Sequence, residues 1–102
     1  MALRIPGGSH DRDARTQSAL EAAIVAEKAA SLGFAGRALE KALAKLGANA
    51  GEDRQALIDA AADRTWSFFV QRELCGLRDN RDAIEEFAIP PEVMARVGAR
   101  RA

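Results

Sequence analysis

Hydrophobic side chains between about residues 13 and 46 recur at spacings of three, four and seven residues, the period of one helix face. One stripe contains Leu20, Ile24 and Phe34, and larger apolar residues continue the pattern at Leu32, Leu39, Leu43 and Leu46. The stretch has no proline and is rich in residues that favour helices. We therefore expect a long first helix over about 13–46.

Two glycines, Gly33 and Gly36, interrupt this first helix. Together they cost about 2 kcal/mol of helix stability relative to alanine. One interpretation is a kink or a close crossing with another helix at this point. The other is a weakened spot that the surrounding bundle tolerates. The sequence leaves both interpretations open.

A second helix is expected over about 52–75, after a turn at 47–51 that holds two glycines and an asparagine. One apolar stripe of this helix has heptad spacing: Ile58, Ala61, Thr65, Phe68, Arg72 and Cys75. A second stripe lies beside it: Ala62, Trp66, Phe69, Val70, Leu74 and Leu77. Because a single partner helix cannot bury both stripes, we expect a further partner.

Two short helices are expected after Gly76. The first is capped by Asp79 or Asn80 and runs to about residue 88, where two prolines stop it. The second covers about 91–97 and ends at Gly98, with Glu92 and Arg96 spaced to form an ion pair. Residues 100–102 should form a loose basic end.

The composition indicates a single all-α domain. The chain has 102 residues, 23 of them alanine, no tyrosine, and few large apolar side chains. We expect a flexible N-terminal arm at 1–12 and one helical domain at 13–102. The predicted architecture is a long antiparallel hairpin with two short C-terminal helices. Two hairpins should pair into a homodimeric four-helix bundle, because a core this thin favours association.

Charge and hydropathy argue against several classes of partner. Fifteen basic and fifteen acidic residues give no net charge, so no global field attracts nucleic acid or an anionic membrane. No apolar run approaches the roughly 18 residues of a spanning helix. The N-terminal residues lack the apolar segment of a secretory signal, and the chain has one cysteine. We expect a cytoplasmic protein that binds neither nucleic acid nor membrane.

The residues needed for common catalytic and metal sites are missing. The one histidine, His10, precedes the first helix, and Cys75 lies on an apolar stripe. This pair cannot build a di-iron or zinc site, and no phosphate-binding glycine motif is present. We therefore expect no metal, no cofactor and no catalytic residue, and an enzyme is the less favoured interpretation.

Polar residues that break the apolar stripes are the best candidates for a site. Glu27 and Arg72 occupy such positions on the two long helices, and Gln71 lies beside Arg72. A buried pair would fix the register of the helices, and a polar pocket for a small ligand is the alternative. The side-chain types of helical chorismate mutases are also present, at Arg15, Lys28, Gln71, Arg72 and Glu73, but their order and spacing differ from that family's pattern.

A cluster on the second helix is the candidate interface. Trp66 and nearby apolar residues cover one face of it, and tryptophan is a common anchor at protein interfaces. The interface is expected to contain Trp66, Phe69, Val70, Leu74 and Leu77. About half of the aromatic cluster formed by Trp66, Phe68 and Phe69 should be buried between two chains.

The segment from Trp66 to Gly98 contains the runs WSFFVQRELCGLRD and AIPPEVMARVG. This segment resembles a family of small bacterial helical proteins of unknown function. The resemblance implies an all-helical fold and transfers no activity. The expected function is therefore that of a helical interaction or regulatory module, acting through self-association or protein binding. A ligand-binding or enzymatic bundle with a pocket near Glu27 and Arg72 is the alternative.

Overall fold

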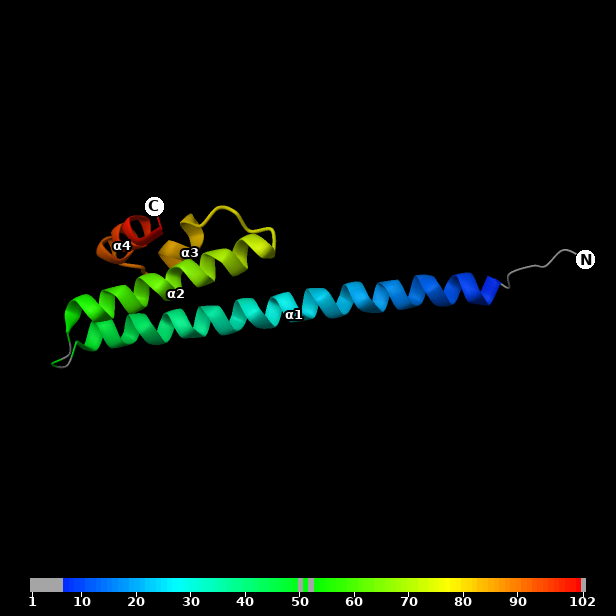
Figure 1. Ribbon diagram of the computed structural model, residues 1–102, viewed down its shortest axis with the longest axis horizontal. Coiled ribbons are helices and arrows are strands. Elements are labelled where there is room, and N and C mark those ends of the chain that lie inside the picture. Colours follow the sequence, from blue (N-terminus) through cyan, green and yellow to red (C-terminus); the bar gives the residue numbers. More distant parts are fainter. Residues whose placement is uncertain (1–6, 50, 52, 102) are drawn as a thin grey trace, which may run out of the picture.

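The protein was analysed as a computed structural model, which describes residues 7–49, 51 and 53–101. Four α-helices follow one another: α1 (Gly7–Ala48), α2 (Arg54–Leu74), α3 (Arg81–Glu86) and α4 (Pro91–Arg101). The long α1 and α2 form an antiparallel hairpin (Figure 1). α4 packs against α2, and Phe87 at the end of α3 reaches α1 at Gly36. The all-α fold and the hairpin are confirmed.

The hairpin turn is made where the sequence predicts it. Asn49 and Gly51 adopt positive φ angles of 39° and 78°, which reverses the chain after α1. Asp53 then caps α2, because its carboxylate accepts a hydrogen bond of 3.0 Å from the backbone N–H of Gln55. α1 begins at Gly7, so the helix includes residues 7–12 of the expected N-terminal arm, whereas residues 1–6 lie outside the described part.

A turn with a positive φ angle precedes each of the two short helices. Gly76, at φ 84°, ends α2, and the N–H of Leu77 donates to the carbonyl of Arg72. Ala88 has φ 50° and lies between α3 and the two prolines, of which Pro91 starts α4. The expectation that α4 ends at Gly98 is wrong, since the helix continues to Arg101.

One apolar core joins the helices, and α2 lies at its centre. Leu39 of α1, Ala61 of α2 and Val93 of α4 are fully buried. Further buried residues come from all four helices and the turn before α4: Ala35, Leu46, Leu57, Ile58, Ala62, Phe68, Ala83, Ile89 and Val97. α4 of the same chain thus covers part of the surface that we expected a second chain to cover. The predicted dimer stays a prediction.

Gly36 marks a close approach between helices. A Cβ atom at this position would lie 3.4 Å from the ring of Phe68 and 3.5 Å from the ring of Phe87. These two rings pack with their centroids 4.8 Å apart. α1 is continuous through this point. The distances from the Cβ position to the two rings are ordinary van der Waals distances, so the structure shows neither a break in α1 nor a crossing that only glycine allows.

The N-terminal half of α1 extends beyond the rest of the molecule (Figure 1). Near the end of α2, the thiol of Cys75 lies 3.8 Å from the carbonyl oxygen of Lys28. The residues of α1 that precede this point, 7–27, are here called the α1 arm. The arm is about 30 Å long at 1.5 Å per residue. The molecule measures 80 × 25 × 20 Å as a result.

Candidate functional site

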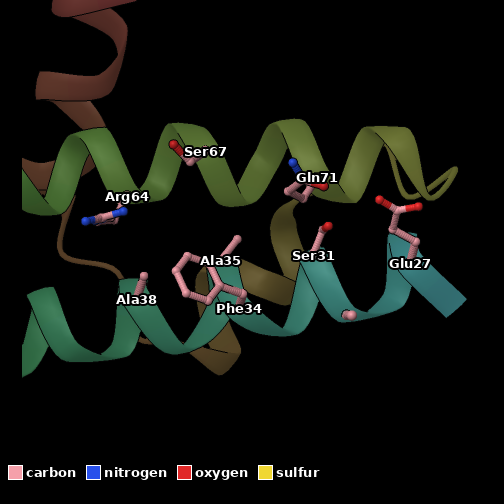
Figure 2. A pocket seen from close by; sticks show the side chains of 9 residues that line it. Glu27, Ser31, Phe34, Ala35, Ala38, Arg64, Ser67 and Gln71 are labelled. Carbon is pink, nitrogen blue, oxygen red and sulfur yellow. The ribbon is translucent and has the colours of Figure 1, made fainter.

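A groove runs between α1 and α2 on one face of the hairpin. Its first part is a hollow of about 480 Å³, in which side chains of both helices line the same space (Figure 2). Small residues predominate, and the polar ones are Glu27, Ser31, Arg64, Ser67 and Gln71. The α1 side is completed by Ala30, Phe34, Ala35 and Ala38.

A second hollow of about 250 Å³ continues the groove toward the hairpin turn. It shares Ala38 and Arg64 with the first. Its other lining residues are Lys41, Ala42, Lys45, Leu57 and Ala60. Together the two hollows form what we call the groove, which follows the hairpin along its length. Its charged edge is mainly basic, from Lys41, Lys45 and Arg64.

The apolar stripe of the α1 arm leads directly into this groove. Leu20 and Ile24 precede Glu27, Ser31, Phe34 and Ala38 at spacings of three and four residues, so all lie on one face of α1. Phe34 is 66% exposed, although it is one of the largest apolar residues of the chain. The arm and the groove therefore form one continuous surface.

The residues of the predicted polar pair separate in the structure. Glu27 and Gln71 line one end of the larger hollow, and the cation that lines it, Arg64, lies at the other end near Ala38 (Figure 2). Arg72 instead donates to the side-chain oxygen of Asn80 at 3.1 Å and to the carbonyl of Asp79 at 2.9 Å. Arg72 also lies 5.8 Å from the centre of the Phe68 ring. Its observed contacts hold the connection between α2 and α3.

The predicted interface residues lie together along α2 and just beyond it. Trp66, Phe69, Val70 and Leu77 line a hollow of about 230 Å³, next to Glu73, Arg78 and Asn80. Phe69 packs partly against the core, whereas Trp66, Leu74 and Leu77 are among the exposed large apolar residues. Whether a partner binds them stays a prediction.

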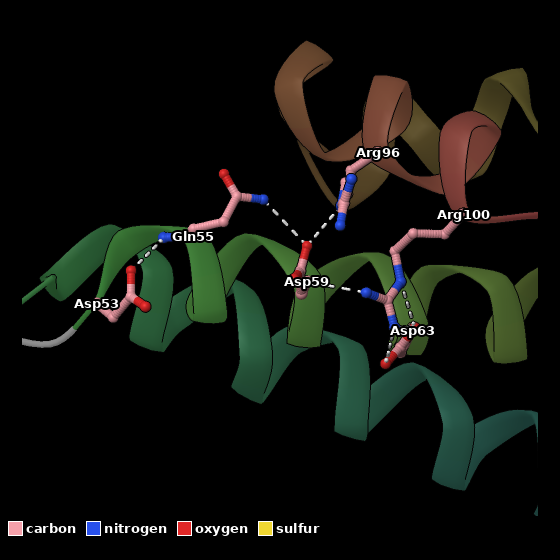
Figure 3. A network of polar contacts seen from close by, with 6 residues as sticks. All are labelled: Asp53, Gln55, Asp59, Asp63, Arg96 and Arg100. Atoms are coloured by element: carbon pink, nitrogen blue, oxygen red, sulfur yellow. Dashed lines mark hydrogen bonds and ion pairs between the residues drawn. The ribbon is translucent and has the colours of Figure 1, made fainter.

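Sequence reasoning missed a polar network that fastens α4 to α2 (Figure 3). Arg96 donates to the Asp59 carboxylate at 2.6 Å, and Arg100 lies 3.5 Å from Asp59 and 3.1 Å from Asp63. Two acidic residues four apart thus face two arginines four apart. This matched spacing is visible in the sequence. The expectation of a loose basic end is therefore wrong for Arg100.

The Asp59 carboxylate is the electrostatic centre of this network. The hydrogen bond from Arg96 is the largest influence and lowers the pKa of Asp59 below its ordinary value of 3.8. Gln55, which donates at 3.1 Å, and the charge of Arg100 lower this pKa as well. The expected pair of Glu92 with Arg96 is replaced by contacts between helices, since Glu92 pairs with Arg54.

The side chains described here do not form an evident catalytic centre. No group of three metal-ligating side chains occurs within this part of the chain. The chorismate mutase residue types do not converge, because Gln71 lines the groove and Glu73 lines the hollow beside Trp66. His10 lies outside the residues whose side chains are described. Among the helices described, none has a stretch long and apolar enough to cross a membrane.

Comparison with known proteins places the chain in a family without assigning it an activity. A family model described as "Family of unknown function (DUF6665)" matches residues 9–102. The match extends well beyond the segment from Trp66 to Gly98 that carries the resemblance in the sequence. Neither a curated protein nor a solved structure is detectably similar to the chain. Because the match covers nearly the whole chain, the protein belongs to this family of unknown function.

Proposed function

We propose that the protein is a helical interaction module that acts through self-association rather than through catalysis. The observation that carries this proposal is the exposure of the α1 arm. Every side chain from residue 11 to residue 30 is exposed. Three large apolar residues are among them, with exposed fractions of 60% for Leu20, 52% for Ile24 and 67% for Val25.

The arm's helical state supports a role in binding. Most helix stability in proteins comes from packing of an apolar face against a neighbour, and isolated helices are marginal in water. The arm has such a face, and its side chains from residue 11 onward are all exposed in the part of the chain that the structure describes. Apolar residues grouped on one exposed surface are typical of protein interaction sites. A bound partner would supply the missing packing.

The exposed part of α2 is a second candidate surface for protein binding. Trp66, Leu74 and Leu77 are exposed, and Trp66 and Leu77 line the hollow described above. Tryptophan buries a large area when it is covered, so it contributes strongly to interfaces. This surface is smaller than the arm, and we assign it a secondary role.

A small-ligand site in the groove is the alternative function. The observation that favours it is that polar side chains line both ends of the larger hollow, with Glu27 and Gln71 at one end and Arg64 at the other. These groups could orient a ligand that carries both an acceptor and a cationic group. The groove is otherwise lined by alanine, serine and Phe34, which provide few groups for a specific reaction.

The molar mass in solution tests self-association directly. We expect light scattering over a dilution series to give twice the 10.9 kDa of the chain at high concentration. A double substitution, Leu20→Glu with Ile24→Glu, should shift the protein to monomer because it places charges on the apolar face of the arm. Ala22→Glu with Ala26→Glu is the matched control, since these positions lie on the other side of the same arm. A monomer at every concentration would contradict the proposal.

A further inference from the structure

The α1 arm and the groove fit one another as two halves of a single interface. Both lie on the same face of α1, with Leu20 and Ile24 on the arm and Phe34 and Ala38 at the groove. The arm offers protruding side chains, whereas the groove offers alanines and serines that leave room for them. A chain cannot fold its own straight arm back onto its groove, because α1 is one continuous helix. The complementary arm must therefore come from another chain.

We propose that the α1 arm of one chain lies antiparallel in the groove of a second copy, with Leu20 opposite Ala38 and Ile24 opposite Phe34. This inference rests on the proposed function, which it deepens by naming the partner and the register. A two-fold axis at the level of residue 29 along α1 relates the two copies. Each contact then occurs twice, as in any isologous dimer.

The lengths of the helices support this arrangement. α1 has 42 residues and α2 has 21. Since α2 reaches back to about Lys28, it covers the second half of α1 and leaves an arm of the same length. In an antiparallel dimer about Ala29, each arm spans the whole groove of the other copy. Neither arm extends far beyond the partner's hairpin turn.

Charges along the arm and the groove are complementary in this register. Asp13 lies on the same face of the arm as Leu20 and falls opposite Lys45 of the second copy. Glu21 falls level with Ala38 and Arg37, and Arg64 lines the groove at that level. Acidic residues of the arm thus face the basic edge of the groove. Such matching favours one orientation over its reverse.

A register shifted by about one helical turn is less favourable. Moving the axis from Ala29 to residue 27 would place Glu27 of each copy directly opposite its equivalent. Two like charges at the centre of an interface oppose association. With the axis near Ala29, Glu27 faces Ser31 instead, whose hydroxyl is able to donate to the carboxylate.

Disulfide crosslinking between chains tests the register. Leu20→Cys and Ala38→Cys are made in separate chains, both with Cys75→Ser, and the two proteins are mixed, denatured together, refolded and oxidised. The opposed positions should bring Cα atoms within disulfide range. We expect about tenfold more covalent dimer than when Leu20→Cys is mixed with Glu40→Cys, because residue 40 lies on the opposite side of α1.

Leu20→Cys alone distinguishes antiparallel from parallel pairing. In the proposed dimer the two copies of residue 20 lie about 27 Å apart along the axis, so they cannot form a disulfide. A covalent dimer of this variant would overturn the proposal in favour of parallel arms. A covalent dimer formed by Leu74→Cys in a chain that carries Cys75→Ser would instead locate the interface on α2 and would also overturn the proposal.

A charge exchange provides an independent readout. Asp13→Lys should weaken dimerisation about tenfold at low salt, and combining it with Lys45→Asp should restore much of the loss. Asp11→Lys is the matched control, because residue 11 lies on the opposite side of the arm. If the wild type is a dimer but the disulfide between residues 20 and 38 does not form and the charge exchange does not restore dimerisation, the register is wrong. The proposed function then still holds. A wild-type monomer contradicts both.

Discussion

Gly36 shows how one residue sets the distance between two helices. A Cβ atom there would just touch the rings of Phe68 and Phe87, which fill the space beyond it. We expect Gly36→Val to lower the free energy of unfolding by about 1–3 kcal/mol, because two extra methyl groups would overpack this contact. The midpoint and slope of urea unfolding measure the change.

Gly47 is the matched control for Gly36. It also lies in α1, but a Cβ atom there would meet nothing within 4 Å. Gly47→Val should therefore leave the stability within a few tenths of a kcal/mol of the wild type, or slightly above it, since valine favours helices more than glycine does. Equal losses for both substitutions would show that the Gly36 contact has no special role.

Hydrophobic periodicity predicts which side chains are buried at some positions and not at others. Thr65 was placed on the apolar stripe of α2, and it is fully buried, with its hydroxyl donating to the carbonyl of Ala61 at 2.8 Å. Glu27 was placed on a stripe by the same reasoning but is exposed. The difference arises because α2 ends near Lys28. Periodicity identifies a face, but it does not show whether another element covers that face.

At the scale of one element, the start of α2 depends on a single cap. Asp53 accepts a hydrogen bond from the N–H of Gln55, one of the helix donors that would otherwise lack a partner. We expect Asp53→Ala to lower the free energy of unfolding by about 1 kcal/mol. Asp53→Asn should retain most of the stability, because its side-chain oxygen can accept the same bond. Equal losses from both substitutions would contradict a capping role.

The docking of α4 on α2 should depend on pH through Asp59. The pKa of this carboxyl is lowered below 3.8 in the folded chain, so its ion pairs stabilise the fold above that pH. The stabilisation is lost as the pH falls through the folded-state pKa. We expect the urea midpoint of the wild type to fall between pH 5 and pH 3 by more than that of Asp59→Asn.

Glu40→Gln controls for the general effect of acid, since it removes an exposed carboxylate of α1 that has no part in the network. The urea midpoint of Glu40→Gln should fall by the same amount as that of the wild type as the pH falls. A pH response unchanged by Asp59→Asn would show that Asp59 contributes nothing to acid sensitivity. High salt should also reduce the wild-type response, because the residues of this network are partly solvent-exposed.

The length of α4 shows why helix ends were harder to predict than helices. Glycine after an apolar run is a common stop signal, so Gly98 was expected to end the helix. The helix continues because Arg96 and Arg100, one turn apart, reach Asp59 and Asp63 on α2. Local preference was outweighed by contacts between elements that are distant in sequence. The two matched pairs could have been recognised only after α2 and α4 were placed side by side.

At the scale of the whole molecule, half of the longest helix lies outside the core. The sequence predicted a long first helix and an unsatisfied apolar surface, and both are present. It located that surface on α2, because the second stripe of α2 contains Trp66 and Leu74. In the structure α4 packs on α2, whereas the side chains of the arm from residue 11 onward are exposed among the described residues. Exposed large apolar residues therefore lie on the arm, at Leu20, Ile24 and Val25, as well as on α2.

Because the α1 arm lies outside the core, we expect the helix content to depend on protein concentration. The hairpin and α4 share a core within one chain, so they should stay folded in a monomer. In the proposed dimer the arm is packed against a second copy, so it should fray when the dimer dissociates. On dilution we expect the helical signal in far-ultraviolet circular dichroism to fall while the core around Phe68 remains protected from hydrogen exchange.

The same coupling makes stability depend on concentration. If only the folded dimer contains ordered arms, each tenfold rise in concentration should add about 1.4 kcal/mol per dimer to the free energy of unfolding. Leu20→Glu with Ile24→Glu should remove this dependence and lower the helical signal to that of the diluted wild type. The variant Ala22→Glu with Ala26→Glu should keep the concentration dependence and the helical signal of the wild type. A helical signal that does not change with dilution, in a protein that light scattering shows to dissociate, would mean that the arm is helical without a partner.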